Sequence, residues 1–265
     1  MGMNIQEAAQ ALLQAERTKQ PIAPLTETNP NMTVDDAYRI QLAQIEEKKG
    51  QGATVAGLKI GLTSKAMQDM LGVYTPDYGF ILNTMVHDEE TPIDASAYIE
   101  PRVEFELAFY FKKTLQGTVT IDDVIDAVDY VVPSIEIIDS RIADWKIKFE
   151  DTVSDNGSSA GAILSSAKTK LSDIADITAI PVTAYKNGEF FDEATTAAVL
   201  GNPLEAVVWL ANAVREYGIT IQAGTFVLSG AVSKAVPFVA GDVFEADFGP
   251  LGKVRAAFAK EAVVK

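Results

Sequence analysis

The spacing of apolar residues changes once along this chain, at the Gly50-Gln51-Gly52 stretch. From about Ile5 to Lys49, apolar residues recur at helical spacing with charged residues between them. After residue 52, β-branched and aromatic runs alternate with turn residues, as in VAGLKIGL, PRVEFELAFYF and DYVVPSIEIID. These patterns predict an α+β fold, with a helical accessory segment over residues 1–52 and one β-rich core over residues 53–265.

Three local signals refine this organisation. Thr33, followed by two aspartates, predicts the start of the second helix, because a hydroxyl cap and an acidic first turn complement exposed amide groups. Asn187-Gly188, between two strand-like runs, predicts a tight hairpin, since both residues tolerate positive φ. Residues 203–217 carry apolar residues on one face and are predicted to form a packing helix.

Two residue types that often build catalytic and metal sites are almost absent. The chain has no cysteine and one histidine, His87, which lies in the acidic run HDEE and is predicted to be on the surface. Thiolate chemistry and multi-histidine zinc sites are therefore excluded. Any metal must be held mainly by oxygen ligands, which favours Mg²⁺ or Mn²⁺ over Ca²⁺ in a compact catalytic site.

The charge balance restricts the partners of the protein. There are 22 basic and 37 acidic residues, giving a formal net charge of -15. Such a surface repels nucleic acid and anionic lipid, so we expect neither as a partner. An acidic substrate can bind only where the local field is reversed, and a divalent cation does this with a single ion.

The first twenty residues carry charges throughout and contain no apolar core of the kind found in a secretory signal. No later segment offers the uninterrupted apolar run that a membrane span requires. We therefore expect a soluble, cytoplasmic protein.

Two glutamates in the run RVEFELAF are candidates for binding such a cation. In an extended strand, Glu104 and Glu106 point to one face, while Val103, Phe105 and Leu107 point to the other. On an ordinary surface strand the same pattern would be a solvated polar face.

A third candidate, Glu136, lies in the run VVPSIEII, which is apolar enough to predict a buried strand. A buried carboxylate is costly to ionise and needs a cation or hydrogen-bonding partners. A divalent metal shared by the three glutamates would satisfy this need. The alternatives are a salt bridge to Arg102 or Arg141, or an exposed position at a strand end.

The chain resembles a known family through five ordered motifs over residues 30–265. These motifs are GLKIGLTS at 57–64, PDYG at 76–79, PRVEFE at 101–106, EIIDSR at 136–141 and DTVSDN at 151–156. They are similar to those of the 2-keto-4-pentenoate hydratase and 4-oxalocrotonate decarboxylase group of the fumarylacetoacetate hydrolase superfamily. The resemblance implies a helical N-terminal segment, a mixed β-roll core of the fumarylacetoacetate hydrolase C-terminal type, and Mg²⁺ or Mn²⁺ held by Glu104, Glu106 and Glu136.

The resemblance also implies roles for three further residues. Lys59 would face the substrate carboxylate or help to move protons, and Ser159 would bind substrate. Asp77 would assist proton transfer or orient a catalytic group. From the residues alone, Lys59 could extend to solvent from its strand and Asp77 could be a turn former. The loop Asp155–Ser159 could be a linker, and residues 67, 70 and 71 are predicted to be packing residues.

The function that the resemblance implies is a lyase of aromatic meta-cleavage catabolism. It would hydrate 2-hydroxypenta-2,4-dienoate (2-keto-4-pentenoate) to 4-hydroxy-2-oxopentanoate. The alternatives are decarboxylation of 4-oxalocrotonate (2-oxo-3-hexenedioate) and a non-catalytic 2-oxo-acid-binding or scaffold subunit. The family also implies a homo-oligomer and association with a pathway enzyme.

Overall fold

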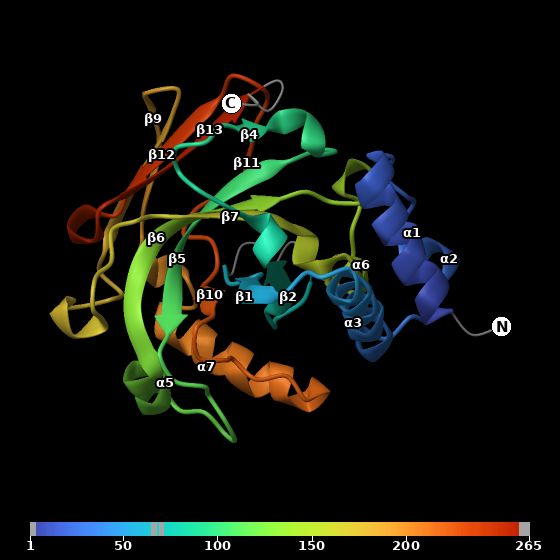
Figure 1. Ribbon diagram of the computed structural model, residues 1–265, viewed down its shortest axis with the longest axis horizontal. Helices are drawn as coiled ribbons and strands as arrows, with labels where there is room; N and C mark the ends of the chain where they lie inside the picture. The colour runs from blue at the N-terminus through green and yellow to red at the C-terminus, as the bar shows by residue number, and fades with distance from the viewer. Residues whose placement is uncertain (1–3, 65–67, 69–71, 260–265) are drawn as a thin grey trace.

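The computed structural model describes residues 4–64, 68 and 72–259. Residues 67, 70 and 71, predicted to pack, lie outside the described residues. Helices come first along the chain and sheets follow, which confirms the predicted α+β fold (Figure 1). The α-helices labelled in Figure 1 are α1 (Ile5–Thr18), α2 (Leu25–Thr28), α3 (Val34–Gly50), α5 (Ile121–Ala127), α6 (Phe149–Ser154) and α7 (Pro203–Val214).

The larger sheet has the strand order β2-β1-β10-β5-β6-β7-β3, and β11 also pairs with β5. Two of its pairings, β1 with β10 and β3 with β7, are parallel, and the others are antiparallel. The sheet curls until β2 contacts β7, which makes a roll with an interior face. Its strands are β1 (Val55–Gly61), β2 (Asp77–Leu82), β3 (Val86–His87), β5 (Arg102–Phe111), β6 (Val128–Ile138), β7 (Ser159–Leu164), β10 (Phe226–Leu228) and β11 (Val236–Pro237).

The smaller sheet packs against the outer face of this roll. Its order is β4-β13-β12-β8-β9, and the Phe244 ring on β12 lies 6.4 Å from the Phe105 ring on β5. Its strands are β4 (Ile93–Asp94), β8 (Pro181–Lys186), β9 (Glu189–Thr195), β12 (Val243–Asp247) and β13 (Lys253–Ala259). Strands β8 and β9 form the predicted hairpin, with φ of 56° at Asn187 and 82° at Gly188.

The alternation along β5 decides which side chains enter the roll. Phe105 and Leu107 face outward into the main core, where they are fully buried. Ala108, Val132 and Leu228 face inward and form a separate apolar cluster. Strand geometry places Glu104, Glu106 and Glu136 on this inward face too. The interior of the roll is therefore apolar at one end and acidic at the other.

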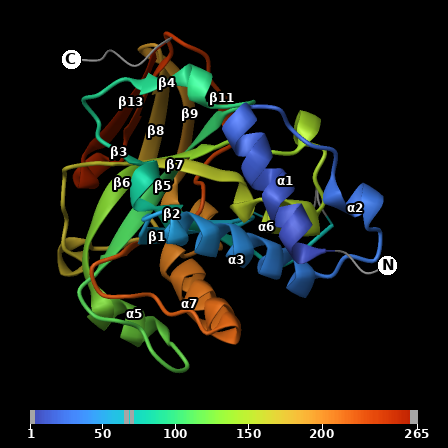
Figure 2. The same ribbon diagram turned by 45° about the vertical axis from the view of Figure 1, so that its right-hand side comes forward.

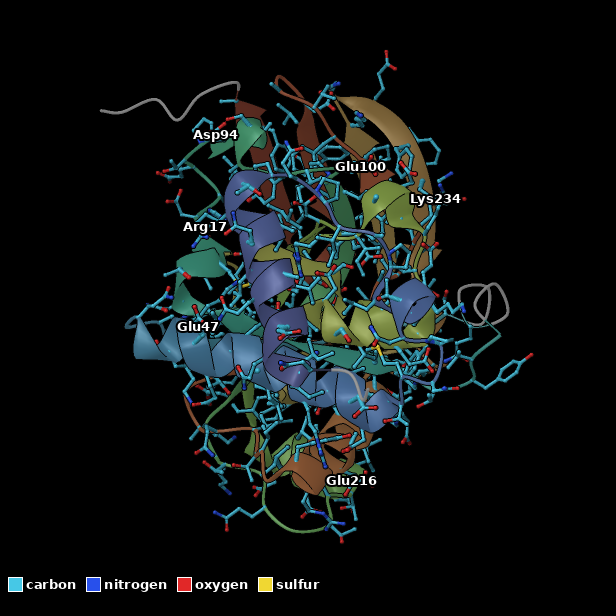
Figure 3. All side chains as sticks on the ribbon, turned by 90° about the vertical axis from the view of Figure 1, so that its right-hand side faces the viewer. Arg17, Glu47, Asp94, Glu100, Glu216 and Lys234 are labelled. Carbon is cyan, nitrogen blue, oxygen red and sulfur yellow. The ribbon has the colours of Figure 1, made fainter. Side chains whose placement is uncertain are left out.

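Helices α1 and α3 cross on one side of the roll, and α3 packs against α6 and contacts β2 (Figure 2). Figure 3 looks onto this side, where Arg17 of α1 and Glu47 of α3 point away from the sheets. Thr33 caps α3 as predicted, and Asp36 completes a reciprocal capping box. The connector before α3 contains the short helix α2, which was not predicted.

Buried amides attach α3 to the roll. The Gln41 side chain donates to the carbonyls of Tyr78 (2.8 Å) and Val153 (3.0 Å), and Gln44 donates to the Ser154 carbonyl (2.7 Å). The Tyr38 ring stacks on Tyr78, with 4.4 Å between ring centroids. The helical segment is thereby fixed to β2 and α6, which both border the site described below.

By length and composition, one described segment, Thr196–Tyr217, is long and apolar enough to cross a membrane. The chain turns at Leu200 and Gly201 within it, where φ is positive. Its regular part, α7, begins at Pro203 as predicted and buries seven side chains, as a packing helix does.

The prediction that His87 lies on the surface holds only in part, because the residue is partly exposed and partly buried. The residue belongs to β3, which pairs in parallel with β7, and its side chain is partly buried. The ring lies over Gly161, where the missing side chain leaves room for it. Burial lowers the pKa of His87 below its usual value.

We expect Gln41→Leu to lower the free energy of unfolding by about 2 kcal/mol, because two buried carbonyls lose a donor. Urea denaturation measures this change. The matched control is Gln51→Leu, at an exposed position at the end of the same helix, and it should change stability by less than about 0.5 kcal/mol. Equal effects of the two substitutions would contradict the assigned role of Gln41.

Candidate metal centre and active site

The register between β5 and β6 brings the three predicted glutamates together. Glu104 lies directly opposite Glu136, and Glu106 is opposite Ser134, two residues further along the same face. One carboxylate oxygen from each glutamate lies within 4.8 Å of the others. The two carboxylates from one strand and the one from the other therefore form a single cluster.

Burial makes this cluster electrostatically costly. Glu106 and Glu136 have no solvent exposure, and Glu104 is partly exposed. Burial raises the pKa of Glu136 to about 7, against an opposing effect of Lys59. Burial and the neighbouring glutamates raise the pKa of Glu106 well above its usual value. Without a cation, the folded protein therefore holds protons here that ordinary carboxylates release.

The donor set fits a hard divalent cation. Both carboxylate oxygens of Glu136 and Oε1 of Glu106 are buried and have no hydrogen-bond partner among the described residues. Oε2 of Glu106 accepts a hydrogen bond from the Gly230 amide at 2.7 Å, which orients that carboxylate. With bonds of about 2.1 Å, oxygens around one octahedral ion lie roughly 3 to 4 Å apart, close to the spacing of this cluster.

Lys59 points into the roll and not to solvent. The side chain is 4% exposed, and Nζ lies 3.7 Å from Oε2 of Glu136 and donates to the Gly157 carbonyl at 2.9 Å. Burial by itself lowers the pKa of Lys59. The negative charges of the nearby carboxylates, chiefly Glu136 and Asp77, raise it by more, so the net pKa lies above its usual value. The ammonium form is therefore stabilised here.

Neither arginine considered as the partner of Glu136 pairs with it. Arg141 forms a buried ion pair with Asp155, with 2.6 Å between Nε and Oδ1, and Arg102 lies over the Trp145 ring at 4.3 Å. The cation that contacts Glu136 is Lys59, which comes from a strand that is not its neighbour in the sheet.

Asp77 is the first residue of β2 and not part of a turn, so that alternative is wrong. It lies opposite Gly61 on β1, and a Cβ at Gly61 would overlap its Oδ1 and approach Lys59 Nζ to 3.1 Å. The carboxyl is buried, Oδ1 has no hydrogen-bond partner among described residues, and burial raises its pKa. Asp77 and Lys59 are thus close neighbours in one polar site.

Residues 155–159 are buried, so the loop is not a linker. Ser159 begins β7, next to β6, and its buried hydroxyl lies close enough to Glu136 to lower the pKa of that carboxyl. The structure therefore brings all six predicted residues to one region.

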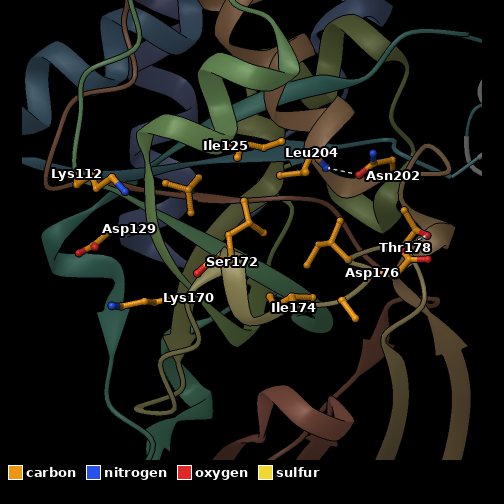
Figure 4. A pocket seen from close by; sticks show the side chains of 14 residues that line it. Lys112, Ile125, Asp129, Lys170, Ser172, Ile174, Asp176, Thr178, Asn202 and Leu204 are labelled. Carbon is orange, nitrogen blue, oxygen red and sulfur yellow. Dashed lines mark hydrogen bonds between the residues drawn. The ribbon is translucent and has the colours of Figure 1, made fainter.

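Two cavities lie outside the glutamate cluster. The one in Figure 4, about 540 Å³, lies between α5, α7 and the segment 170–178 and contains none of the six predicted residues. Another, about 550 Å³, lies between α1, α3 and the β3 edge, and Ser159 is among its lining residues. Neither is lined by the glutamate cluster.

Sequence reasoning placed Asp155 and Asn156 in a motif without assigning them a supporting role, and it did not consider Gly230. Arg141 was considered only as a partner for Glu136. A buried arginine needs a carboxylate partner, and Asp155 in the DTVSDN motif is the one that the fold supplies.

A raised carboxyl pKa makes stability depend on pH. The folded protein binds the Glu136 proton more tightly than the unfolded chain, so stability is lost as pH rises from about 4.5 to about 7. We expect the metal-free protein to lose ~3 kcal/mol through Glu136 over this range. In denaturant titrations, Glu136→Gln should be less pH-dependent than the parent, and Mg²⁺ should flatten the parent profile. Parallel profiles would refute this account.

Comparison with known proteins identifies the family of this chain. Residues 61–259 match the fumarylacetoacetate (FAA) hydrolase C-terminal family model. A 2-hydroxyhexa-2,4-dienoate hydratase of Comamonas testosteroni is 43% identical over 91% of this chain and 92% of its own. A 2-keto-4-pentenoate hydratase of Paraburkholderia xenovorans is 42% identical over 96% of this chain and 94% of its own.

A solved structure extends the agreement to the whole fold. The 4-oxalocrotonate decarboxylase of Pseudomonas putida G7, complexed with magnesium and adipate, superposes with a TM-score of 0.92 at 37% identity, covering 96% of this chain and 97% of the other. Sequence and fold therefore agree over nearly the entire length, and the chain belongs to the fumarylacetoacetate hydrolase family.

Proposed function

We propose that this protein is a metal-dependent lyase that hydrates 2-hydroxypenta-2,4-dienoate to 4-hydroxy-2-oxopentanoate. The observation that carries the proposal is the buried cluster of Glu104, Glu106 and Glu136 beside Lys59 and Asp77. The relatives named hydratases, at 42–43% identity, support the reaction type.

Glu104, Glu106 and Glu136 would hold Mg²⁺ or Mn²⁺ through the carboxylate oxygens that lack other partners. When bound, the cation would supply Lewis acidity toward a 2-oxo acid and compensate the negative charge of the cluster. Magnesium in the decarboxylase structure supports this choice of ion.

The reaction requires two proton transfers and one addition of water. The dienol gives up its hydroxyl proton and receives a proton at C5, which yields the 2-oxo-3-enoate. Water then adds across the remaining double bond, with oxygen at C4 and hydrogen at C3. Asp77 is suited to move these protons, because its buried carboxyl has a raised pKa and an unpartnered oxygen.

Lys59 is suited to a different role. The surrounding carboxylates favour its ammonium form, so it would bind the substrate carboxylate or stabilise negative charge on the substrate. The Ser159 hydroxyl would donate a hydrogen bond to the substrate from the Glu136 side.

The second candidate is decarboxylation of 4-oxalocrotonate, which releases CO₂ and leaves 2-hydroxypenta-2,4-dienoate. The decarboxylase of Pseudomonas putida G7, with its TM-score of 0.92, supports it. Its substrate carries a second carboxylate that the site would have to accommodate. We place it second because the relatives named hydratases have higher identity to this chain than the decarboxylase.

We also propose a cytoplasmic homo-oligomer that associates with a pathway enzyme, on the basis of the family resemblance. A catalytic segment over residues 53–265, with an accessory segment over residues 1–52, is part of the same proposal. It is supported by the position of all six candidate site residues after residue 52.

Substrate assays separate the two reactions. With Mg²⁺ or Mn²⁺, we expect loss of conjugated absorbance from 2-hydroxypenta-2,4-dienoate, formation of 4-hydroxy-2-oxopentanoate, and little CO₂ from 2-oxo-3-hexenedioate. Chelation of the metal should abolish turnover. CO₂ release from the diacid without hydration of the monoacid would exclude the leading proposal.

Glu106→Gln tests the proposed ligand set. We expect it to weaken Mn²⁺ binding at least tenfold, measured by calorimetry, because one anionic oxygen ligand is lost. Because less metal is bound, turnover of this variant at a fixed metal concentration should also fall. The control, Glu193→Gln on an exposed position of β9, should leave both unchanged. Unaltered Mn²⁺ affinity in Glu106→Gln would remove this residue from the site.

A further inference from the structure

Three consecutive residues beside Lys59 adopt a left-handed backbone conformation. The φ angles are 57° at Asn156, 59° at Gly157 and 54° at Ser158. For residues with a Cβ this conformation costs roughly 1–2 kcal/mol each, and it rarely extends beyond single residues. A turn of this kind persists only where surrounding contacts impose it.

One set of these contacts comes from Arg141. Its guanidinium donates to Oδ1 and the backbone carbonyl of Asp155, and to the carbonyls of Asp139 and Ser159. The Ser158 hydroxyl donates to Oδ2 of Asp155 at 3.1 Å. Both ends of the turn are therefore held by one buried ion pair.

The other contacts come from the Asn156 side chain. Its Oδ1 accepts from the Phe80 amide at 2.8 Å, and its Nδ2 donates to the Phe80 carbonyl at 2.9 Å. The side-chain amide of Asn156 thus forms the same pair of hydrogen bonds with the Phe80 backbone that a neighbouring strand would form. Close approach needs Gly79, where a Cβ would overlap the Asn156 carbonyl. The turn is thereby attached to the strand that carries Asp77.

The turn presents one carbonyl to the site. The Gly157 carbonyl accepts a 2.9 Å hydrogen bond from Lys59 Nζ, which is shorter than the 3.7 Å separation of Nζ from Glu136. A Cβ at Gly157 would lie 3.3 Å from Lys59 Cδ, so the backbone packs along the lysine stem. The position of this carbonyl therefore determines where the ammonium group lies.

We propose that Asn156 is a positioning residue that acts through Lys59. By fixing the turn to β2, it holds the Gly157 carbonyl where Lys59 is directed between Glu136 and Asp77. The expected effect of Asn156 on turnover rests on the proposed function of Lys59. Its expected effect on the position of the Lys59 ammonium group does not.

Asn156→Gly removes the amide and keeps a residue that tolerates positive φ. Its control is Asn187→Gly in the β8–β9 hairpin, where asparagine also has positive φ and its Oδ1 accepts a backbone N–H, from Val243. We expect crystal structures to show the Lys59–Gly157 hydrogen bond lost in Asn156→Gly and kept in Asn187→Gly. An unchanged bond in Asn156→Gly overturns the proposal, whether or not the protein hydrates dienoates.

Kinetics test whether the effect passes through Lys59. We expect Asn156→Gly to lower kcat/KM about tenfold in the parent and less than about twofold in the Lys59→Met background, at saturating Mn²⁺. Equal losses in both backgrounds would indicate general structural damage and overturn the proposal. Absence of turnover in the parent would count against the proposed function alone, since the crystallographic comparison still applies.

A second substitution covers the case in which Asn156→Gly does not fold. Asn156→Asp keeps the size of the side chain and the acceptor for the Phe80 amide, but it replaces the donor to the Phe80 carbonyl with an oxygen. It should displace the turn and lengthen the Lys59–Gly157 separation. Retention of the 2.9 Å hydrogen bond in this variant would likewise overturn the proposal.

Discussion

The antiparallel register of β5 and β6 is the constraint on which the rest of the site depends. It sets Glu104 opposite Glu136 and keeps Glu106 on the same face. Because side chains alternate along a strand, a slip of one residue would turn the glutamates into the outer core and Phe105 into the roll. The apolar burial of Phe105 and Leu107 against the second sheet therefore also specifies where the carboxylates lie.

The same arrangement carries an electrostatic cost that a bound cation would offset. Among the described residues, Lys59 is the cation that contacts the three carboxylates, and its one positive charge is less than their combined negative charge. Burial is the main cause that raises the pKa of Glu136 to about 7, and the charge of Glu104 adds to it. A divalent ion would restore the balance and provide the electrophile that a 2-oxo acid requires.

Close packing around Lys59 depends on the absence of side chains at Gly61, Gly79 and Gly157. A Cβ at Gly61 would overlap Asp77, and one at Gly79 would overlap the backbone of Asn156. These glycines allow β1, β2 and the left-handed turn to approach one another closely. The shared site is compatible with both hydration and decarboxylation, because both reactions need an activated 2-oxo acid and controlled proton transfer.

The sequence alone determined the local features of this protein. Periodicity predicted the helices and strands, the Asn187-Gly188 turn and the face shared by Glu104 and Glu106, because each depends on neighbours within a few residues. The ordered motifs identified the family. Only the tertiary structure decided that Lys59 and not an arginine contacts Glu136, that Asp77 begins a strand, that His87 is partly buried, and that Arg141 pairs with Asp155. Those contacts join separate segments, and their partners are chosen by strand order and register, which local spacing does not encode.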